Sequence, residues 1–143
     1  ESLFSGVTDT SFALNASATR GMLMTVLARY AGTDTTDGAT WYEKGMEWAK
    51  TNGVSDGTNP NADITREQLV TMLYRYAGTP EPTGSLDGFN DKDAVSDYAA
   101  DALCWAVDEG LLTGKGGGWL DPAGTATRAE MAAILMRFTE SHN

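Results

Sequence analysis

Three arginines occupy a setting that suits the binding of an anion. Arg20, Arg66 and Arg128 each follow a threonine, and each opens a stretch with helical periodicity. The helix macrodipole disfavours a cation at this end of a helix. A guanidinium beside unpaired helix N–H groups, however, matches the geometry of a carboxylate. Two roles are therefore open: these side chains pair with carboxylates of neighbouring segments, or they hold an acidic ligand.

The stretches behind these arginines repeat one another. In each, apolar side chains recur at i, i+3, i+4 and i+7, which predicts an α-helix with one buried face. These positions are Leu23, Val26, Leu27 and Tyr30; Leu69, Met72, Leu73 and Tyr76; and Met131, Ile134, Leu135 and Phe138. Thr65 with Gln68 and Thr127 with Glu130 fit the capping box, whereas Thr19 caps alone.

A second helical pattern alternates with the first. It runs from Trp41 to Asn52, where Gly53 stops it, and it recurs from Tyr98 to Gly110. A Gly-x-x-x-Gly turn follows each copy and ends at Gly57 or Gly114. The repeating unit is thus a helix, a glycine turn, a loop and a Thr-Arg helix.

These units predict one all-α domain built from helix–loop–helix repeats over residues 1–143. We place the repeats at 1–31, 33–78 and 86–139, and the Thr-Arg heads are 46 and 62 residues apart. The first repeat has only its C-terminal part. We therefore expect the chain to be a fragment of a longer protein, with the missing helix supplied by another chain, a displaced segment or a dimer contact.

Composition limits the function. A net charge of −10 argues against nucleic acid and anionic membranes as partners, and no apolar run is long enough to span a bilayer. One cysteine, Cys104, and one histidine, His142, offer neither a zinc site nor a catalytic triad, so we expect no enzyme activity and no cofactor. The segment 59–63 only superficially matches a calcium loop, and calcium binding stays open.

Several motifs in order resemble the S-layer homology (SLH) module. They are Phe89-x-Asp91 before Tyr98, Gly-Leu-Leu-x-Gly at 110–114, Asp121-Pro122 and Thr-Arg-Ala-Glu at 127–130. The resemblance covers nearly the whole chain, with one complete copy at 89–138. It implies a pseudo-threefold spindle of helices that anchors proteins to the bacterial cell wall, outside the cell. The implied ligand is a secondary cell-wall polysaccharide bearing a pyruvyl ketal, bound in grooves between repeats.

The resemblance also implies which residues meet the glycan, because they share a place in the repeat: the head arginine, the motif aspartate, the first aromatic and the turn glycine. They are Arg20, Arg66 and Arg128; Asp34 and Asp91; Trp41 and Tyr98; and Gly57 and Gly114. The arginines would bind the ketal carboxylate, and the aspartates would accept hydrogen bonds from sugar hydroxyls. The second copy departs from the pattern, with Gly32 in place of the phenylalanine.

Alternatives stay open beside this reading. The aspartates would equally serve to cap helices or close loops, and the aromatics would equally serve the core. The main rival function is a protein-interaction module of a larger exported protein with no glycan site, and a weaker one is a module that binds soluble polysaccharide. The positions of the head arginines would distinguish these functions. A glycan site requires them to be exposed in grooves, whereas a protein-interaction module would have them in internal ion pairs.

Overall fold

A computed structural model of the chain describes residues 16–32, 43–55, 59, 61–82, 84–86, 89–112 and 120–141. In this part of the chain the secondary structure is helical, with isolated β-bridges and no strand. The elements are α1 (Arg20–Tyr30), α2 (Glu43–Thr51), α3 (Arg66–Tyr76), the 3-10 turns η3 (Lys92–Ala94) and η4 (Asp97–Ala99), α4 (Ala100–Asp108) and α5 (Arg128–Ser141). The predicted all-α fold is confirmed.

The three Thr-Arg helices, α1, α3 and α5, begin side by side because a ring of backbone hydrogen bonds joins the segments that lead into them. Ala18 donates to the carbonyl of Ala126 at 2.9 Å, and Ala126 donates to that of Ile64 at 3.0 Å. Ile64 donates back to the carbonyl of Ala18 at 2.9 Å and closes the ring. Segments far apart in the sequence are thus held together before any of the three helices starts.

The same helices also meet near their C-terminal ends, through three aromatic rings. Centroid distances are 6.0 Å from Tyr30 to Tyr76, 6.3 Å from Tyr30 to Phe138 and 6.0 Å from Tyr76 to Phe138. Helices that adjoin at both ends in this way run in the same direction. The pseudo-threefold spindle and the repeat boundaries stay predictions, since parts of every repeat lie outside the described residues.

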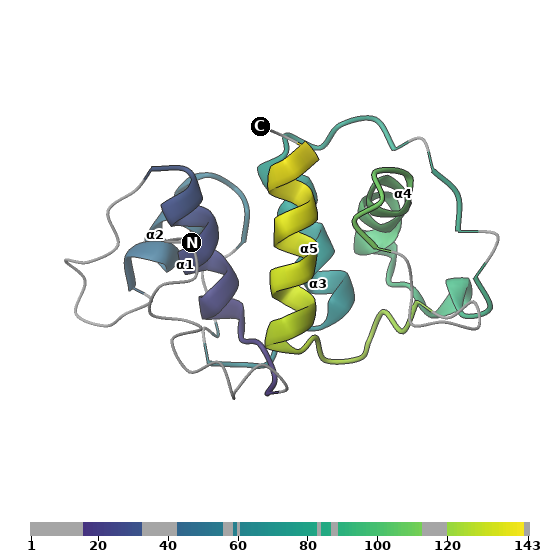
Figure 1. Ribbon diagram of the computed structural model, residues 1–143, viewed down its shortest axis with the longest axis horizontal. Coiled ribbons are helices and arrows are strands. Elements are labelled where there is room, and N and C mark those ends of the chain that lie inside the picture. The colour runs from purple at the N-terminus through teal and green to yellow at the C-terminus, as the bar shows by residue number, and fades with distance from the viewer. Residues whose placement is uncertain are drawn as a thin grey trace.

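The other two helices pack on the outside of this bundle. Figure 1 shows α1 and α2 on one side, α4 on the other, and α5 (yellow) in front of α3. α2 packs on α1, and α4 packs on α3. A Cβ at Gly45 of α2 would lie 2.7 Å from the Cα of Thr25 in α1, so only glycine lets the two backbones approach this closely.

The core consists of the apolar positions that the periodicity predicts. Leu23, Leu69 and Met131 are completely buried, and nearly all their partners at i+3, i+4 and i+7 are also buried. The predicted stops are confirmed as well, because Gly32, Gly53 and Gly110 take φ angles of +92°, +72° and +77° after α1, α2 and α4. Trp105 is buried, and Cys104 is half-buried.

One stripe of α5 is more exposed than its counterparts on α1 and α3. Ala129 is exposed and Met136 is 57% exposed. The equivalent residues of α1 are Gly21 and Ala28, which are buried on the helix that α2 covers. The expectation that another chain, a displaced segment or a dimer contact supplies the missing helix of the first repeat stays a prediction.

Candidate functional site

The heads of the three central helices differ at their third helical position. Thr65 accepts from the backbone N–H of Gln68 at 3.2 Å, and the Gln68 side chain accepts from that of Thr65 at 3.0 Å. Thr127 and Glu130 form the same box, with distances of 3.1 and 2.9 Å. In α1 the third helical residue is Met22, whose side chain cannot accept a hydrogen bond from the backbone N–H of Thr19. Thr19 therefore caps α1 alone, and its Oγ1 accepts from the backbone N–H of Met22 at 3.2 Å. The capping prediction is confirmed at all three heads.

The head of α1 borders the larger of two cavities that are lined by corresponding residues of the repeats. This cavity, the Arg20 pocket, has a volume of about 490 Å³ and is lined by Arg20, Ser55, Gln68, Thr71, Met72, Arg75 and Tyr98. Arg20 donates from Nη2 to Ser55 Oγ at 3.2 Å. The described residues that line the pocket include two guanidiniums and no carboxylate. They come from all three predicted repeats, so the pocket depends on the assembled bundle.

Tyr98 stands at the edge of this pocket with 53% of its surface exposed. Its hydroxyl donates to Glu67 Oε2 at 3.4 Å, and Ser96 donates to the same carboxylate from its backbone N and its Oγ at 3.0 and 2.7 Å. Burial of the hydroxyl raises the pKa of Tyr98, and the charge of Glu67 raises it further, while Arg20 and Arg75 act against both. The phenol is therefore neutral at physiological pH and lies within the field of both guanidiniums.

The head of α3 borders a smaller cavity, the Arg66 pocket, of about 170 Å³. It is lined by Arg66, Leu111, Leu112, Glu130, Ala133, Ile134 and Arg137. Six of these occupy the same places in the repeat as residues of the Arg20 pocket. In order along the chain, Arg66, Leu112, Glu130, Ala133, Ile134 and Arg137 correspond to Arg20, Ser55, Gln68, Thr71, Met72 and Arg75.

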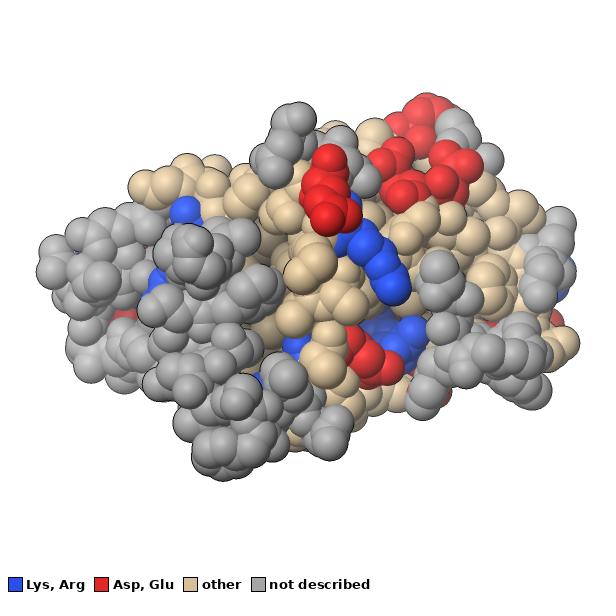
Figure 2. All heavy atoms as spheres, in the orientation of Figure 1, with Lys and Arg blue, Asp and Glu red and all other residues tan. Residues whose placement is uncertain are grey.

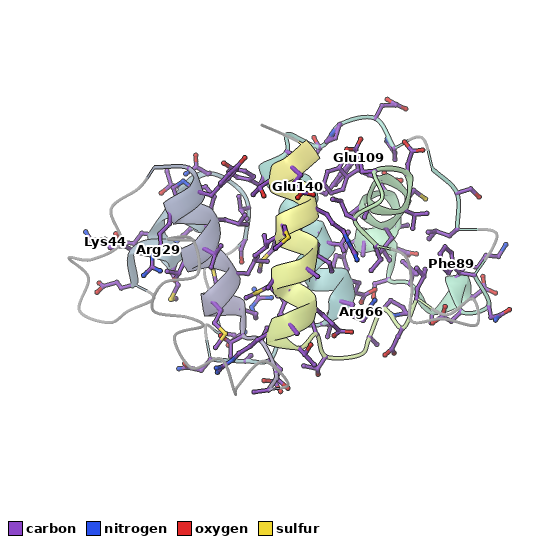
Figure 3. The ribbon with its side chains drawn as sticks, viewed as in Figure 1. Arg29, Lys44, Arg66, Phe89, Glu109 and Glu140 are labelled. Atoms are coloured by element: carbon purple, nitrogen blue, oxygen red, sulfur yellow. The ribbon has the colours of Figure 1, made fainter. Side chains whose placement is uncertain are left out.

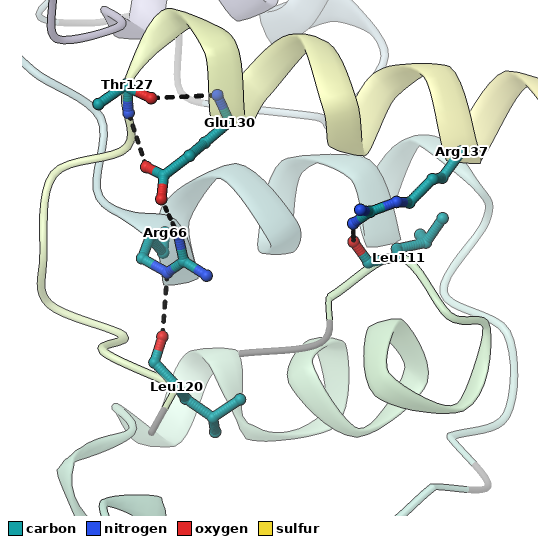
Figure 4. Close-up of polar contacts among 6 residues, drawn as sticks. All are labelled: Arg66, Leu111, Leu120, Thr127, Glu130 and Arg137. Carbon is teal, nitrogen blue, oxygen red and sulfur yellow. Dashed lines mark hydrogen bonds and ion pairs between the residues drawn. The ribbon is translucent and has the colours of Figure 1, made fainter. Parts of the chain in front are cut away.

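Arg66 is held by the protein itself (Figure 4). It is 5% exposed, donating from Nε to the carbonyl of Leu120 at 3.0 Å and from Nη1 to Glu130 Oε2 at 2.7 Å. Arg137 likewise donates to the carbonyl of Leu111 at 3.2 Å. Figure 3 shows Arg66 within the molecule, in contrast to Lys44 at its edge. Arg66 therefore forms an internal ion pair, as expected of a head arginine if the domain is a protein-interaction module with no glycan site.

Charges of both signs mark the surface over this region. Figure 2 shows basic and acidic side chains side by side over the middle of the face where α5 lies, and acidic side chains gathered over α4. Among the described residues drawn in Figure 2, the basic side chains on this face do not form a continuous patch.

Asp91 holds the loop whose carbonyl group accepts a hydrogen bond from Arg66. Its two carboxylate oxygens accept the backbone N–H groups of Leu120 and Asp121 at 2.9 and 2.8 Å, which fixes the carbonyl that Arg66 contacts. Desolvation acts to raise the pKa of Asp91, but the backbone hydrogen bonds outweigh it and lower that pKa below its ordinary value. Of the two roles left open for Asp91, the structure shows it closing a loop.

Of the remaining predicted residues, the structure describes only Arg128, which is not among the described residues that line the two pockets. Arg128 is half-buried, and its Nε has no hydrogen-bond partner among the described residues. Its backbone N–H donates to the carbonyl of Ala16 at 2.9 Å. Asp34, Trp41, Gly57 and Gly114 lie outside the described residues.

Sequence reasoning missed most of the polar lining of the Arg20 pocket. Ser55, Gln68, Thr71 and Arg75 were not among the predicted site residues. One signal was available for Arg75, because an Arg-aromatic pair recurs nine residues after each head arginine. Arg75 lines the pocket beside Arg20, the head arginine of the preceding repeat. This placement depends on how one repeat packs on the next, so the sequence pattern alone does not give it.

Comparison with known families identifies the segment that carries η3, η4, α4 and the start of α5. Residues 88–132 match the family model of the S-layer homology domain. This segment of the chain is therefore assigned to the S-layer homology family. S-layer homology domains are non-catalytic modules that anchor proteins to cell-wall polymers, and they occur in cell-surface and S-layer proteins. The match lies within the third predicted repeat and covers most of it, and the division of the chain into three repeats stays a prediction.

No curated protein matches the chain. Within the described residues, no helix combines the length and apolarity needed to cross a membrane. The same residues contain no group of three or more histidine, cysteine or acidic side chains placed to bind a metal ion.

Proposed function

We propose that this S-layer homology domain anchors an exported bacterial protein by binding an acidic secondary cell-wall polysaccharide in the Arg20 pocket. The observation that carries the proposal is the convergence of Arg20 and Arg75 in one cavity with an exposed tyrosine. Two guanidiniums suit the carboxylate of a pyruvyl ketal, because each offers several N–H donors in a planar fork.

The rest of the pocket suits the sugar that carries such a ketal. Ser55, Gln68 and Thr71 provide hydroxyl and amide groups that donate to and accept from sugar hydroxyls. The exposed ring of Tyr98 offers an apolar face for the C–H side of the sugar. A volume of about 490 Å³ falls in the usual range for small-ligand sites, roughly 300–1,000 Å³, whereas the 170 Å³ of the Arg66 pocket falls below it.

The net charge of −10 opposes an anionic polymer at long range. At physiological ionic strength, screening confines such repulsion to roughly 8 Å, so the two guanidiniums beside the ligand dominate the local field. We therefore expect binding to persist at physiological salt in spite of the acidic surface.

Sedimentation with purified cell walls tests the proposal. The wild-type domain should pellet with untreated walls and stay in solution after mild acid has removed the pyruvyl ketals. Arg75→Ala should bind weakly, and Lys50→Ala is the matched control, because each removes one cation from the last turn of a helix. Equal retention on both kinds of wall would refute the proposal.

A protein-interaction module is the second candidate, and two observations favour it. Arg66 is committed to an internal ion pair, and the α5 stripe that includes Ala129 and Met136 is exposed. In this case the domain would bind another protein through α5. Substituting Met136 by Lys would then abolish the interaction that retains the domain at the wall, while Arg75→Ala would leave it intact.

A further inference from the structure

Glu67 is a buried carboxylate that has no counterpart at the heads of the other two central helices. It occupies the second helical position of α3, where α1 has Gly21 and α5 has Ala129. Glu67 is 7% exposed. The helix macrodipole favours a negative charge at this end of a helix, but a carboxylate this deeply buried costs free energy unless hydrogen bonds satisfy it. Its hydrogen-bond donors therefore indicate its role.

Three donors reach this carboxylate, and all of them belong to the 3-10 turn η4 or to the residue just before it. Oε1 accepts from the backbone N–H of Ser96 at 3.0 Å. Oε2 accepts from the Ser96 Oγ at 2.7 Å and from the Tyr98 hydroxyl at 3.4 Å. The backbone of Glu67 is fixed as well, because its N–H donates to the carbonyl of Pro122 at 3.0 Å and its carbonyl accepts from Thr71 Oγ1 at 2.7 Å. The carboxylate is thus a fixed anchor for the residues that lead into α4.

This anchor sets how Tyr98 meets the Arg20 pocket. The hydroxyl is turned towards a buried carboxylate, yet Tyr98 lines the pocket and is 53% exposed, so its exposed surface is mainly the aromatic ring. The hydroxyl proton is donated to Glu67 and is not available to a ligand. A ring that is held in place before binding has little side-chain freedom left to lose when a sugar packs on it.

We propose that Glu67 is a positioning residue, which holds Tyr98 so that the face of its ring, and not its hydroxyl, meets the sugar that carries the acidic group. This inference rests on the proposed function and adds to it the part of the ligand that Tyr98 contacts. Ala129, the counterpart of Glu67 on α5, has no carboxylate. The head of α5 therefore cannot anchor an aromatic residue in this way.

Two probes separate the sugar from its acidic group. One is a methyl hexoside with a 4,6-linked pyruvyl ketal, and the other is 2,2-dimethoxypropionate, which has the same ketal carboxylate without a sugar ring. NMR titration measures the dissociation constant of each probe, and the readout is the ratio of the two affinities. The charge of Glu67 and any partial unfolding affect both probes alike, so neither changes this ratio.

The variants are Glu67→Ala, Tyr98→Phe and the combination of both. Alanine already occupies the equivalent position of α5, so a central helix of this bundle can begin with it. Tyr74→Phe is the matched control, because it removes a tyrosine hydroxyl that donates to the carbonyl of Pro80 at 2.7 Å, and Tyr74 is not among the described residues that line the pocket.

Each single variant should lower the preference for the hexoside about two- to tenfold, which is the cost of ordering one side chain on binding. The double variant should lower it no further, because both substitutions remove the same contact. Tyr74→Phe should keep the wild-type ratio. In a pH titration of the ¹³C-labelled ring, the pKa of Tyr98 should fall in Glu67→Ala, since burial still raises it but the carboxylate no longer does.

Three results would overturn the inference while the proposed function stands. If Glu67→Ala and Tyr98→Phe keep the wild-type ratio, Glu67 does not position the ring. If Tyr98→Phe lowers the ratio as much again in the Glu67→Ala background, the hydroxyl contacts the ligand itself. If the wild type binds both probes equally well, the ring of Tyr98 does not meet the sugar. If the wild type binds neither probe, the proposed function fails and this inference fails with it.

Discussion

Arg66 and Arg20 occupy the same place in the repeat, but their replacement should affect different properties. Replacing Arg66 should mainly lower stability, and replacing Arg20 should mainly weaken binding. Arg66→Ala removes a side chain that is 5% exposed, leaves the carbonyl of Leu120 without its donor and leaves Glu130 without its cation. Arg20→Ala removes a half-exposed side chain from a cavity. The first change should destabilise the fold, and the second should weaken wall binding.

The size of the effect follows from the contacts. A hydrogen bond from a charged donor is worth about 1.5–3 kcal/mol. The ion pair adds roughly 1 kcal/mol or less, because the Glu130 side chain is 33% exposed and water screens it. Arg66→Ala should therefore cost about 2–4 kcal/mol, which lowers the melting temperature of a chain of this size by roughly 5–12 °C. Arg20 is less buried than Arg66, so Arg20→Ala should lower the melting temperature by less than Arg66→Ala does.

Thermal and urea unfolding, together with sedimentation on cell walls, measure both properties. Arg66→Met is a useful companion, because it keeps most of the apolar stem and isolates the loss of the polar contacts. The reasoning is refuted if Arg66→Ala melts with the wild type, or if Arg20→Ala loses several degrees of stability and still binds walls normally.

Two further predictions concern the framework. The lowered pKa of Asp91 contributes stability that is fully present above the ordinary aspartate pKa near 3.8 and is lost as pH falls through the folded-state value; Asp91→Asn should be destabilised at pH 6 and should lose less between pH 6 and pH 3 than the wild type in urea unfolding. Gly45→Ala forces a methyl group against the backbone of Thr25, so despite a better helix propensity it should cost about 1–2 kcal/mol in the same assay, whereas Lys50→Ala on the same helix should be nearly neutral.

Much of the scaffold could be read from local sequence. The i, i+3, i+4, i+7 pattern identified the buried faces of α1, α3 and α5. The Thr-x-x-Gln and Thr-x-x-Glu pairs located the first turns of α3 and α5. These features depend on residues within one or two helical turns of each other. Periodicity and capping chemistry therefore contain the information.

The pockets could not be read in the same way. Arg20, Arg66 and Arg128 look equivalent in sequence, yet Arg66 is buried against Glu130 and Arg20 borders the larger cavity. The difference arises 64 residues away along the chain, where Glu130 approaches Arg66 because α3 and α5 begin side by side. Asp91 was ambiguous for the same reason, since the loop that it holds is 29 residues away. Only the packing of one repeat on the next decides these roles.

The ring formed by Ala18, Ile64 and Ala126 limits how such a protein can change in length. An open stack of repeats tolerates the gain or loss of a unit, because each unit contacts only its neighbours. A closed cycle has no outer unit to add to or remove, and deleting one member strands a donor and an acceptor in the other two. Gene duplication would therefore have to add a complete second ring. A single extra repeat would have no free donor or acceptor in the existing ring with which to pair.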